Sequence, residues 1–233
     1  MVNRGEGDTT LRDPGIYFRF RPQSLRPESA RSNHLVPAVF LDRDGVIVEE
    51  VNYLHRLEDL RLLPGALETI KDLNDRDWMV VVVTNQAGIG RGYYGWPEFE
   101  VVQISIETSL ENLGGWFDAV CACGYHEDGI GILRQGDHPF RKPNIGMLAA
   151  AAERLGIQLS ASWLIGDSRT DIEAAMNANL RGAVQVRSGH GSRDRDYVRS
   201  LAVRAHFQLL FAEDLKEAGE MVASRTLARQ KSL

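Results

Sequence analysis

Short apolar runs that end in polar side chains alternate along this chain with segments of helical periodicity. The runs are four to six residues long, and such lengths are typical of buried strands. Strands that are apolar on both faces are typical of a parallel sheet covered by helices. The predicted strands are 38–42, 79–83, 117–121, 162–167, 183–186 and 206–211. The alternation predicts an α/β fold with a doubly wound, mainly parallel sheet.

Apolar residues spaced by three and four predict the helices between these strands. Two stretches lack this spacing: 87–92 is too rich in glycine for a helix, and the arginine-rich stretch through Tyr197 is expected to be a loop. The predicted inward-facing residues are Leu67, Ile70 and Leu73, then Phe99, Val102, Ile106, Leu110 and Leu113, then Leu148, Ala151, Ala152 and Leu155, and finally Leu215, Ala218 and Val222.

Polar side chains follow three of the predicted strands directly. Asp42 ends the first and Asp44 follows it in the loop, Thr84 and Asn85 follow the second, and Asp167 ends the fourth. Because parallel strands present their carboxyl ends at one edge of a sheet, where ligands bind, we expect these groups to converge. Two carboxylates one residue apart repel each other unless a cation joins them, and Mg²⁺ prefers carboxylates together with phosphate oxygens. The alternative is that Asp-Arg-Asp-Gly is only a turn, and from these residues alone the two interpretations are about even.

Two cations, Arg141 and Lys142, precede the helix expected after Pro143, and a helix N-terminus favours an anion. Lysine occurs only four times in the chain, which makes Lys142 more informative than usual. Asp171, four residues after Asp167, either supports a metal site from behind or is an acid favoured by the helix dipole.

Composition bounds the remaining possibilities. The formal charge of -5 and pI of about 5.7 offer no basic face for nucleic acid. We see no signal peptide or membrane span, and Cys121 and Cys123 are too close for a comfortable disulfide. We therefore expect a cytoplasmic protein. We also expect it to be a monomer. Residues 1–37 are expected to form an extended, poorly ordered arm with one docking strand at 16–20, and residues 38–233 to form one domain.

Four motifs in this order resemble the haloacid dehalogenase (HAD) superfamily of phosphatases. They are Asp42-x-Asp44-x-Val46, Thr84, Lys142, and Gly166-Asp167 followed by Asp171. Two longer matches, 85–92 (NQAGIGRG) and 141–148 (RKPNIGML), are similar to the branch of heptose bisphosphate phosphatases and histidinol phosphatases. The resemblance spans about residues 38–186 and implies a phosphomonoester hydrolase. The spans between Gly45 and Val83 and between Cys123 and Lys142 leave no room for a large cap domain.

The resemblance also implies roles for individual residues. Asp42 would attack phosphorus to form an aspartyl phosphate, and Asp44 would act as general acid and base. Mg²⁺ would contact the Asp42 and Asp167 carboxylates and the Asp44 backbone carbonyl. The phosphorylated substrate, a compact sugar or polyol, would contact Thr84, Asn85, Lys142, Arg91 and Arg141, with the two arginines available for a second phosphate. The alternative for Arg141 is an ion pair with a loop acid.

The chain departs from this branch in two places. A structural zinc site with four Cys and His ligands is common there, whereas the corresponding positions here are Cys123, Tyr125, His138 and Phe140. We therefore expect no structural zinc, although Cys121 and His126 could replace the missing ligands. Ser168 stands where the family often has lysine, which weakens one phosphate or metal contact.

Three alternatives stay open. The enzyme could be a histidinol-phosphate or other polyol-phosphate phosphatase rather than one for a heptose bisphosphate. A phospho-acceptor signalling domain also uses an Asp, a Thr and a Lys on a doubly wound sheet, but Asp44 would promote turnover, which such a domain avoids. The last alternative is a binding relative that has lost its activity.

Overall fold

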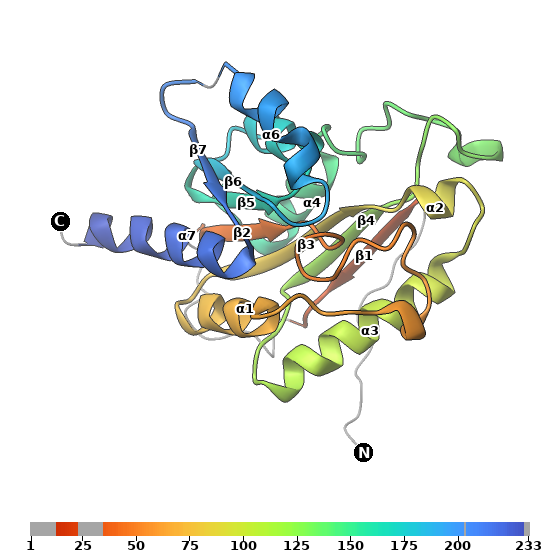
Figure 1. Ribbon diagram of the computed structural model, residues 1–233, viewed down its shortest axis with the longest axis horizontal. Helices are drawn as coiled ribbons and strands as arrows, with labels where there is room; N and C mark the ends of the chain where they lie inside the picture. Colours follow the sequence, from red (N-terminus) through yellow and green to blue (C-terminus); the bar gives the residue numbers. More distant parts are fainter. Residues whose placement is uncertain (1–12, 23–34, 203, 231–233) are drawn as a thin grey trace.

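The computed structural model describes residues 13–22, 35–202 and 204–230, and within them one seven-stranded sheet forms the centre of the molecule (Figure 1). The strands are β1 (Ile16–Phe20), β2 (Ala38–Leu41), β3 (Met79–Asn85), β4 (Ala119–Cys123), β5 (Trp163–Gly166), β6 (Gly182–Val186) and β7 (Gln208–Ala212). The helices are α1 (Ala66–Asp75), α2 (Ala87–Gly90), α3 (Trp96–Asn112), α4 (Gly146–Leu155), α5 (Arg169–Asn177), α6 (Gly191–Ser200) and α7 (Leu215–Gln230).

The strand order is β1-β4-β3-β2-β5-β6-β7, with β2 in the middle. Strands β2 to β7 pair in parallel, and only β1 runs antiparallel, against β4. The chain moves outward from β2 through β3 to β4 and then returns to the other side of β2 through β5. The carboxyl end of β2 is therefore the point where a doubly wound sheet opens a crevice for ligands. The expected fold class is confirmed.

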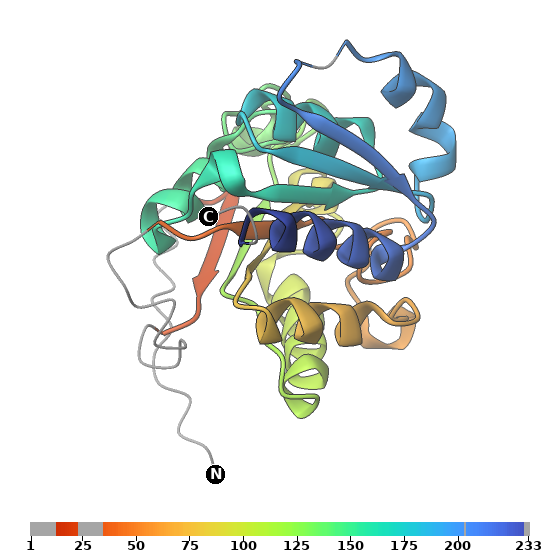
Figure 2. The same ribbon diagram turned by 90° about the vertical axis from the view of Figure 1, so that its left-hand side faces the viewer.

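Helices cover both faces of the sheet, as Figure 2 shows edge-on. Successive strand residues point to opposite faces. Val39 and Leu41 pack in one cluster with α1, α3 and α7, while Ala38 and Phe40 pack in the other with α4 and α5. Burial of all four β2 residues on both faces explains why the strand is a continuous apolar run without polar alternation.

Two helices form where none was predicted, and one predicted core residue is exposed. Residues 87–90 make the single turn α2, because burial of Ile89 and close packing of Gly90 on the Gly124 carbonyl offset the conformational cost of glycine. The arginine-rich stretch forms α6, whose single large buried side chain, Val198, is too little to produce a periodic pattern. Leu113 lies just beyond the end of α3 and is 42% exposed.

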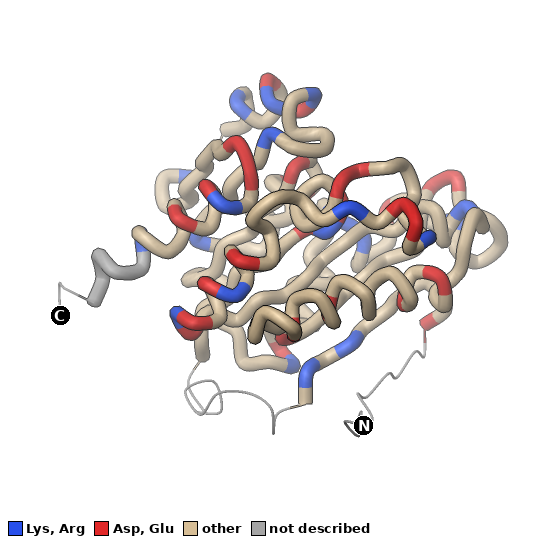
Figure 3. The backbone as a smooth tube through the Cα atoms, turned by 60° about the horizontal axis from the view of Figure 1, so that its bottom comes forward, with Lys and Arg blue, Asp and Glu red and all other residues tan. Residues whose placement is uncertain are grey.

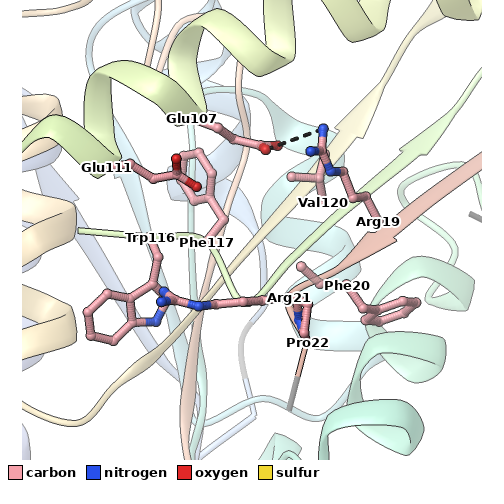
Figure 4. A pocket seen from close by; sticks show the side chains of 10 residues that line it. Arg19, Phe20, Arg21, Pro22, Glu107, Glu111, Trp116, Phe117 and Val120 are labelled. Atoms are coloured by element: carbon pink, nitrogen blue, oxygen red, sulfur yellow. Dashed lines mark ion pairs between the residues drawn. The ribbon is translucent and has the colours of Figure 1, made fainter. Parts of the chain in front are cut away.

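The predicted docking strand at 16–20 is present as β1, which pairs with β4 and contacts α3 through Arg19. Arg19 pairs with Glu107 on α3, with Nη1 3.4 Å from Oε2, and the Arg21 guanidinium lies 4.4 Å from the centre of the Trp116 ring (Figure 4). These groups line a cavity of about 140 Å³. Because Phe20 pairs with Ala119, at the start of β4, this cavity lies at the end of the sheet opposite to the ligand crevice. The rest of the expected arm, 1–12 and 23–34, lies outside the described residues.

Short connections, with no inserted domain in the described part of the chain, surround the crevice. Residues 42–65 join β2 to α1 with one short 3₁₀ helix, Leu57–Asp59, and residues 124–145 join β4 to α4 with another, Gly131–Leu133. Acidic and basic positions are interspersed along the backbone in Figure 3. Among the described residues, no helix is both long and apolar enough to cross a membrane.

Candidate active site

A tight turn directly after β2 presents two carboxylates at the sheet's carboxyl edge. The Asp42 backbone N–H donates to the Ile165 carbonyl of β5 over 3.0 Å, so Asp42 is anchored between two strands. The Arg43 carbonyl then accepts N–H groups from Ile47 and Val48, which closes the turn. Gly45 has a φ of 79°, a left-handed conformation that favours glycine.

A buried lysine joins two of the acids at this edge. Lys142 Nζ lies 2.6 Å from Asp171 Oδ1 and 3.1 Å from Asp42 Oδ1, and it donates to the Val83 carbonyl over 2.7 Å. Three oxygen atoms therefore lie within 3.1 Å of the ammonium group. Although burial lowers the pKa of Lys142, the Asp171 and Asp42 carboxylates raise it above its usual value, so the lysine stays charged.

Carboxylate oxygens of Asp42, Asp167 and Asp171 lie within 4.8 Å of one another. Burial raises the pKa of Asp42, and Asp171 and Asp44 raise it further, against the opposing effect of Lys142. Burial likewise raises the pKa of Asp167, with Asp42 as the next cause. Negative charge therefore exceeds positive charge here, and a divalent cation bound to oxygen ligands would correct the imbalance.

Asp167 is held in a narrow cradle between two glycine-containing turns. One carboxylate oxygen accepts the His190 backbone N–H over 2.6 Å. A Cβ atom on Gly45 would approach this oxygen to 2.5 Å, and one on Gly189 would clash with it. The Ser188 hydroxyl donates to the Gly45 carbonyl over 2.6 Å and ties the two turns together. The donor set of Asp42 and Asp167 thus fits Mg²⁺.

Asp171 caps the N-terminus of α5 and also pairs with Lys142. As the third residue of α5 it accepts the Ser168 backbone N–H over 3.0 Å and the Ser168 hydroxyl over 2.7 Å, which makes a capping box. Its other oxygen binds Lys142. It therefore holds the lysine in place while it caps the start of α5.

Asn85 fixes the segment that carries Lys142. Its side-chain amide donates to the Lys142 carbonyl and accepts the Lys142 backbone N–H, both over 3.0 Å. These two hydrogen bonds join the end of β3 to the loop before α4 in the way that paired backbone groups join two strands. Asn85 therefore positions Lys142, in addition to bordering the cavity.

A cavity of about 330 Å³ opens over these groups. The predicted residues that line it are Asp42, Asp44, Thr84, Asn85, Arg141, Lys142 and Asp167, and unpredicted ones are Glu50, Ser168, Arg169, Thr170, His190, Arg193 and Asp194. Seven of the nine predicted site residues thus converge on one cavity, and Asp171 supports it from behind.

The two arginines expected near a second phosphate lie in different places. Arg141 lines the cavity, and its Nη1 donates to the Tyr125 carbonyl over 2.9 Å. Arg91 does not line the cavity. Its guanidinium instead donates to the Tyr53 hydroxyl over 2.7 Å and to Asp128 over 2.9 Å. Arg91 therefore joins the connection before α1 to the connection before α4.

At the positions that correspond to the zinc ligands of that branch, aromatic rings pack against one another. The ring of Tyr125 stacks on His138 with centroids 3.8 Å apart, and His138 Nδ1 accepts the Phe140 backbone N–H. Cys121 and Cys123 are buried thiols of β4. His126 groups instead with Glu127 and Asp128.

Sequence reasoning missed the residues that hold Asp44. Arg43, which is fully buried, and Gln86 both donate to the Asp44 carboxylate. Gln86 was recognisable as a polar group at a strand end, but its partner 42 residues earlier was not. An arginine between two aspartates gives no local signal of burial.

The chain matches known proteins along most of its length. A family model described as HAD-hydrolase-like matches residues 139–218. A D-glycero-beta-D-manno-heptose-1,7-bisphosphate 7-phosphatase of Mesorhizobium japonicum is 38% identical over 94% of this chain and 94% of its own. A D-glycero-D-manno-heptose-1,7-bisphosphate 7-phosphatase of Thermosynechococcus vestitus is 38% identical over 83% of this chain and 98% of its own.

Solved structures agree with these relatives. A structure from Mesorhizobium loti, described as HAD-like phosphatase, superposes with a TM-score of 0.78 at 35% identity, over 93% of this chain and 95% of its own. The D,D-heptose 1,7-bisphosphate phosphatase of B. bronchiseptica, complexed with magnesium and phosphate, has a TM-score of 0.68 at 27% identity, over 82% of this chain and 99% of its own.

Proposed function

This chain belongs to the HAD-like hydrolases and is a phosphatase, and we propose that it removes one phosphate from a small phosphorylated sugar, a heptose bisphosphate, through an aspartyl phosphate. The observation that carries the proposal is the buried Lys142, which lies between Asp42 and Asp171 and lines a cavity together with Asp167. A cation held against a carboxylate at a strand end can bind the phosphoryl oxygens while that carboxylate attacks phosphorus.

The reaction proceeds in two displacements. In the first, an Asp42 oxygen bonds to phosphorus while the bond from phosphorus to the leaving oxygen breaks, and Asp44 gives its proton to that oxygen. In the second, water attacks the same phosphorus and passes a proton to Asp44. The bond from phosphorus to the Asp42 oxygen breaks, so inorganic phosphate is released and the Asp42 carboxylate is restored. Thr84 and Lys142 hold the phosphoryl oxygens throughout both steps.

Mg²⁺ is the cofactor we propose for this site. The Asp42 and Asp167 carboxylates and the Asp44 backbone carbonyl would hold it, and when bound it would offset the negative charge of the phosphoryl group and the surrounding acids. The magnesium in the B. bronchiseptica relative supports this choice.

Two findings support a bisphosphate substrate. The relatives that match most of the chain carry the names of heptose bisphosphate phosphatases. Arg141 also borders the cavity beside Lys142, and burial lowers its pKa because the cation is poorly solvated, which a second phosphate would relieve. Histidinol phosphate is the alternative substrate, since the motif 141–148 is also similar to that branch.

The test is a panel of phosphomonoesters assayed with and without magnesium: heptose 1,7-bisphosphate, histidinol phosphate, glucose 6-phosphate, glycerol 3-phosphate and p-nitrophenyl phosphate. We expect magnesium-dependent phosphate release, with the heptose bisphosphate preferred. Asp42→Asn should leave less than about 1% of turnover, because an amide is a poor nucleophile. An active Asp42→Asn variant would refute the nucleophile, and a wild-type protein inactive on every ester would favour a binding relative.

Arg141→Ala tests the second-phosphate role. It should lower kcat/KM for the bisphosphate by about ten- to a hundredfold, or roughly 1.5 to 3 kcal/mol, because a charge-assisted contact is lost. The matched monophosphate should lose much less. Equal losses on the two substrates would contradict this role and favour histidinol phosphate or a sugar monophosphate.

A further inference from the structure

The side chain of Asp44 is held from one side by two residues. Arg43 Nε donates to Asp44 Oδ1 and Nη2 to Oδ2, each over 3.0 Å, in a two-pronged contact that fixes the plane of the carboxylate. Gln86 Nε2 donates to Oδ2 over 2.9 Å. The Asp44 side chain stays 19% exposed and lines the cavity, so it remains open to a substrate.

Gln86 can hold Asp44 because its own orientation is fixed by four partners. Nε2 donates to Asp44 and, over 2.9 Å, to the Thr84 hydroxyl. Oε1 accepts from the Tyr94 hydroxyl over 2.5 Å and from Arg43 over 3.3 Å. If the amide were flipped, its nitrogen would face a guanidinium and its oxygen would face a carboxylate. Only the observed orientation satisfies these groups.

Tyr94 supports Gln86 from the protein interior. The tyrosine is 8% exposed, and its ring stacks on His55 with centroids 5.0 Å apart. Burial raises the pKa of its hydroxyl, which therefore remains a donor at any physiological pH. Tyr94 thus donates to Gln86, and Gln86 donates to Asp44, the proposed acid and base.

We infer that Gln86 and Tyr94 are positioning residues for Asp44, and that with Arg43 they determine how well the enzyme cleaves esters whose leaving group is an unactivated alkoxide. The inference rests on the proposed function. An alkoxide leaves only if the Asp44 proton reaches its oxygen as the phosphorus–oxygen bond breaks. p-Nitrophenolate is a stable anion and leaves without a proton, so its departure does not depend on where Asp44 lies.

The test compares leaving groups in Gln86→Met and Tyr94→Phe. The substrates are p-nitrophenyl phosphate and the alkyl phosphate of the panel that the wild type hydrolyses best. The measured quantity is kcat/KM, because it reports only the steps up to Asp42 phosphorylation. Arg43 is left unchanged, since loss of a buried cation would destabilise the fold. Tyr17→Phe is the matched control: it also removes a buried tyrosine hydroxyl, here bonded to Glu100, at the far edge of the sheet.

Gln86→Met should lower kcat/KM for the alkyl phosphate by about ten- to a hundredfold and that for p-nitrophenyl phosphate by less than about threefold. Tyr94→Phe should show the same selectivity with a smaller loss, about three- to tenfold on the alkyl phosphate. The Tyr17→Phe variant should leave the ratio of the two substrates unchanged.

Equal losses on both substrates would overturn the inference while leaving the proposed function intact, as would a Tyr94→Phe variant indistinguishable from Tyr17→Phe. A wild-type protein that hydrolyses no ester of the panel would overturn the proposed function itself, and this inference with it. Urea denaturation of each variant identifies any loss that comes from unfolding.

Discussion

Replacement of Lys142 by methionine is the most direct test of the electrostatics at the site. The Lys142 side chain is 1% exposed and lies between Asp42 and Asp171, so the variant leaves two buried carboxylates without their cation. Methionine keeps the length of the aliphatic stem, which limits any packing loss. Removal of one partner of a buried ion pair costs about 3 to 5 kcal/mol, and we expect a loss of that size in the free energy of unfolding.

The assay is urea denaturation at pH 8 in the presence of a chelator, above the raised pKa of Asp42, about 7. Lys71→Met is the matched control, because Lys71 pairs with Asp75 over 2.5 Å on an exposed face of α1. The control should cost no more than about 0.5 kcal/mol. Costs that agree within about 1 kcal/mol between the two variants would refute the reasoning that Lys142 neutralises buried acids.

Two further predictions concern metal ions. The pKa of Asp42 is raised from 3.8 to about 7, and that of Asp167 from 3.8 to about 8, by burial and facing charges. The folded state therefore holds protons that the unfolded state releases, and the metal-free protein should lose stability as the pH rises from about 4 to about 8. Thermal denaturation should show this loss in a chelator and much less of it with magnesium; stability that rises over this range in the chelator would contradict the assignment. Elemental analysis after purification without added metal should find far less than one zinc per chain, because Tyr125 and Phe140 replace two ligands. Stoichiometric zinc, together with unfolding on chelation, would mean that Cys121 or His126 had taken the place of the missing ligands.

The positions along the chain of the polar groups that meet at the candidate site could be predicted because they depend on local pattern. An apolar run such as 79–83 predicts a buried strand, and the polar residues bonded covalently to its end must lie at the sheet's edge. Thr84 and Asp167 were found in this way, and both line the cavity. The same logic failed for α6, where a single buried valine stabilises a helix without leaving a period.

Only the tertiary structure decided what each polar group contacts. Arg91 lies in the glycine-rich stretch 87–92 and was expected to contact the substrate, yet its guanidinium donates to Tyr53 and Asp128 of other segments. No role was predicted for Arg43, but it is fully buried and aligns Asp44.

Hydrogen bonds between distant segments explain this difference. The Ser188 hydroxyl binds the Gly45 carbonyl across 143 positions of the chain, and Lys142 and Asn85 meet across 57. Such contacts depend on how the strands are ordered in the sheet. Hydrophobic periodicity determines which segments enter the sheet, whereas the fold of the whole chain determines which side chains meet at its edge.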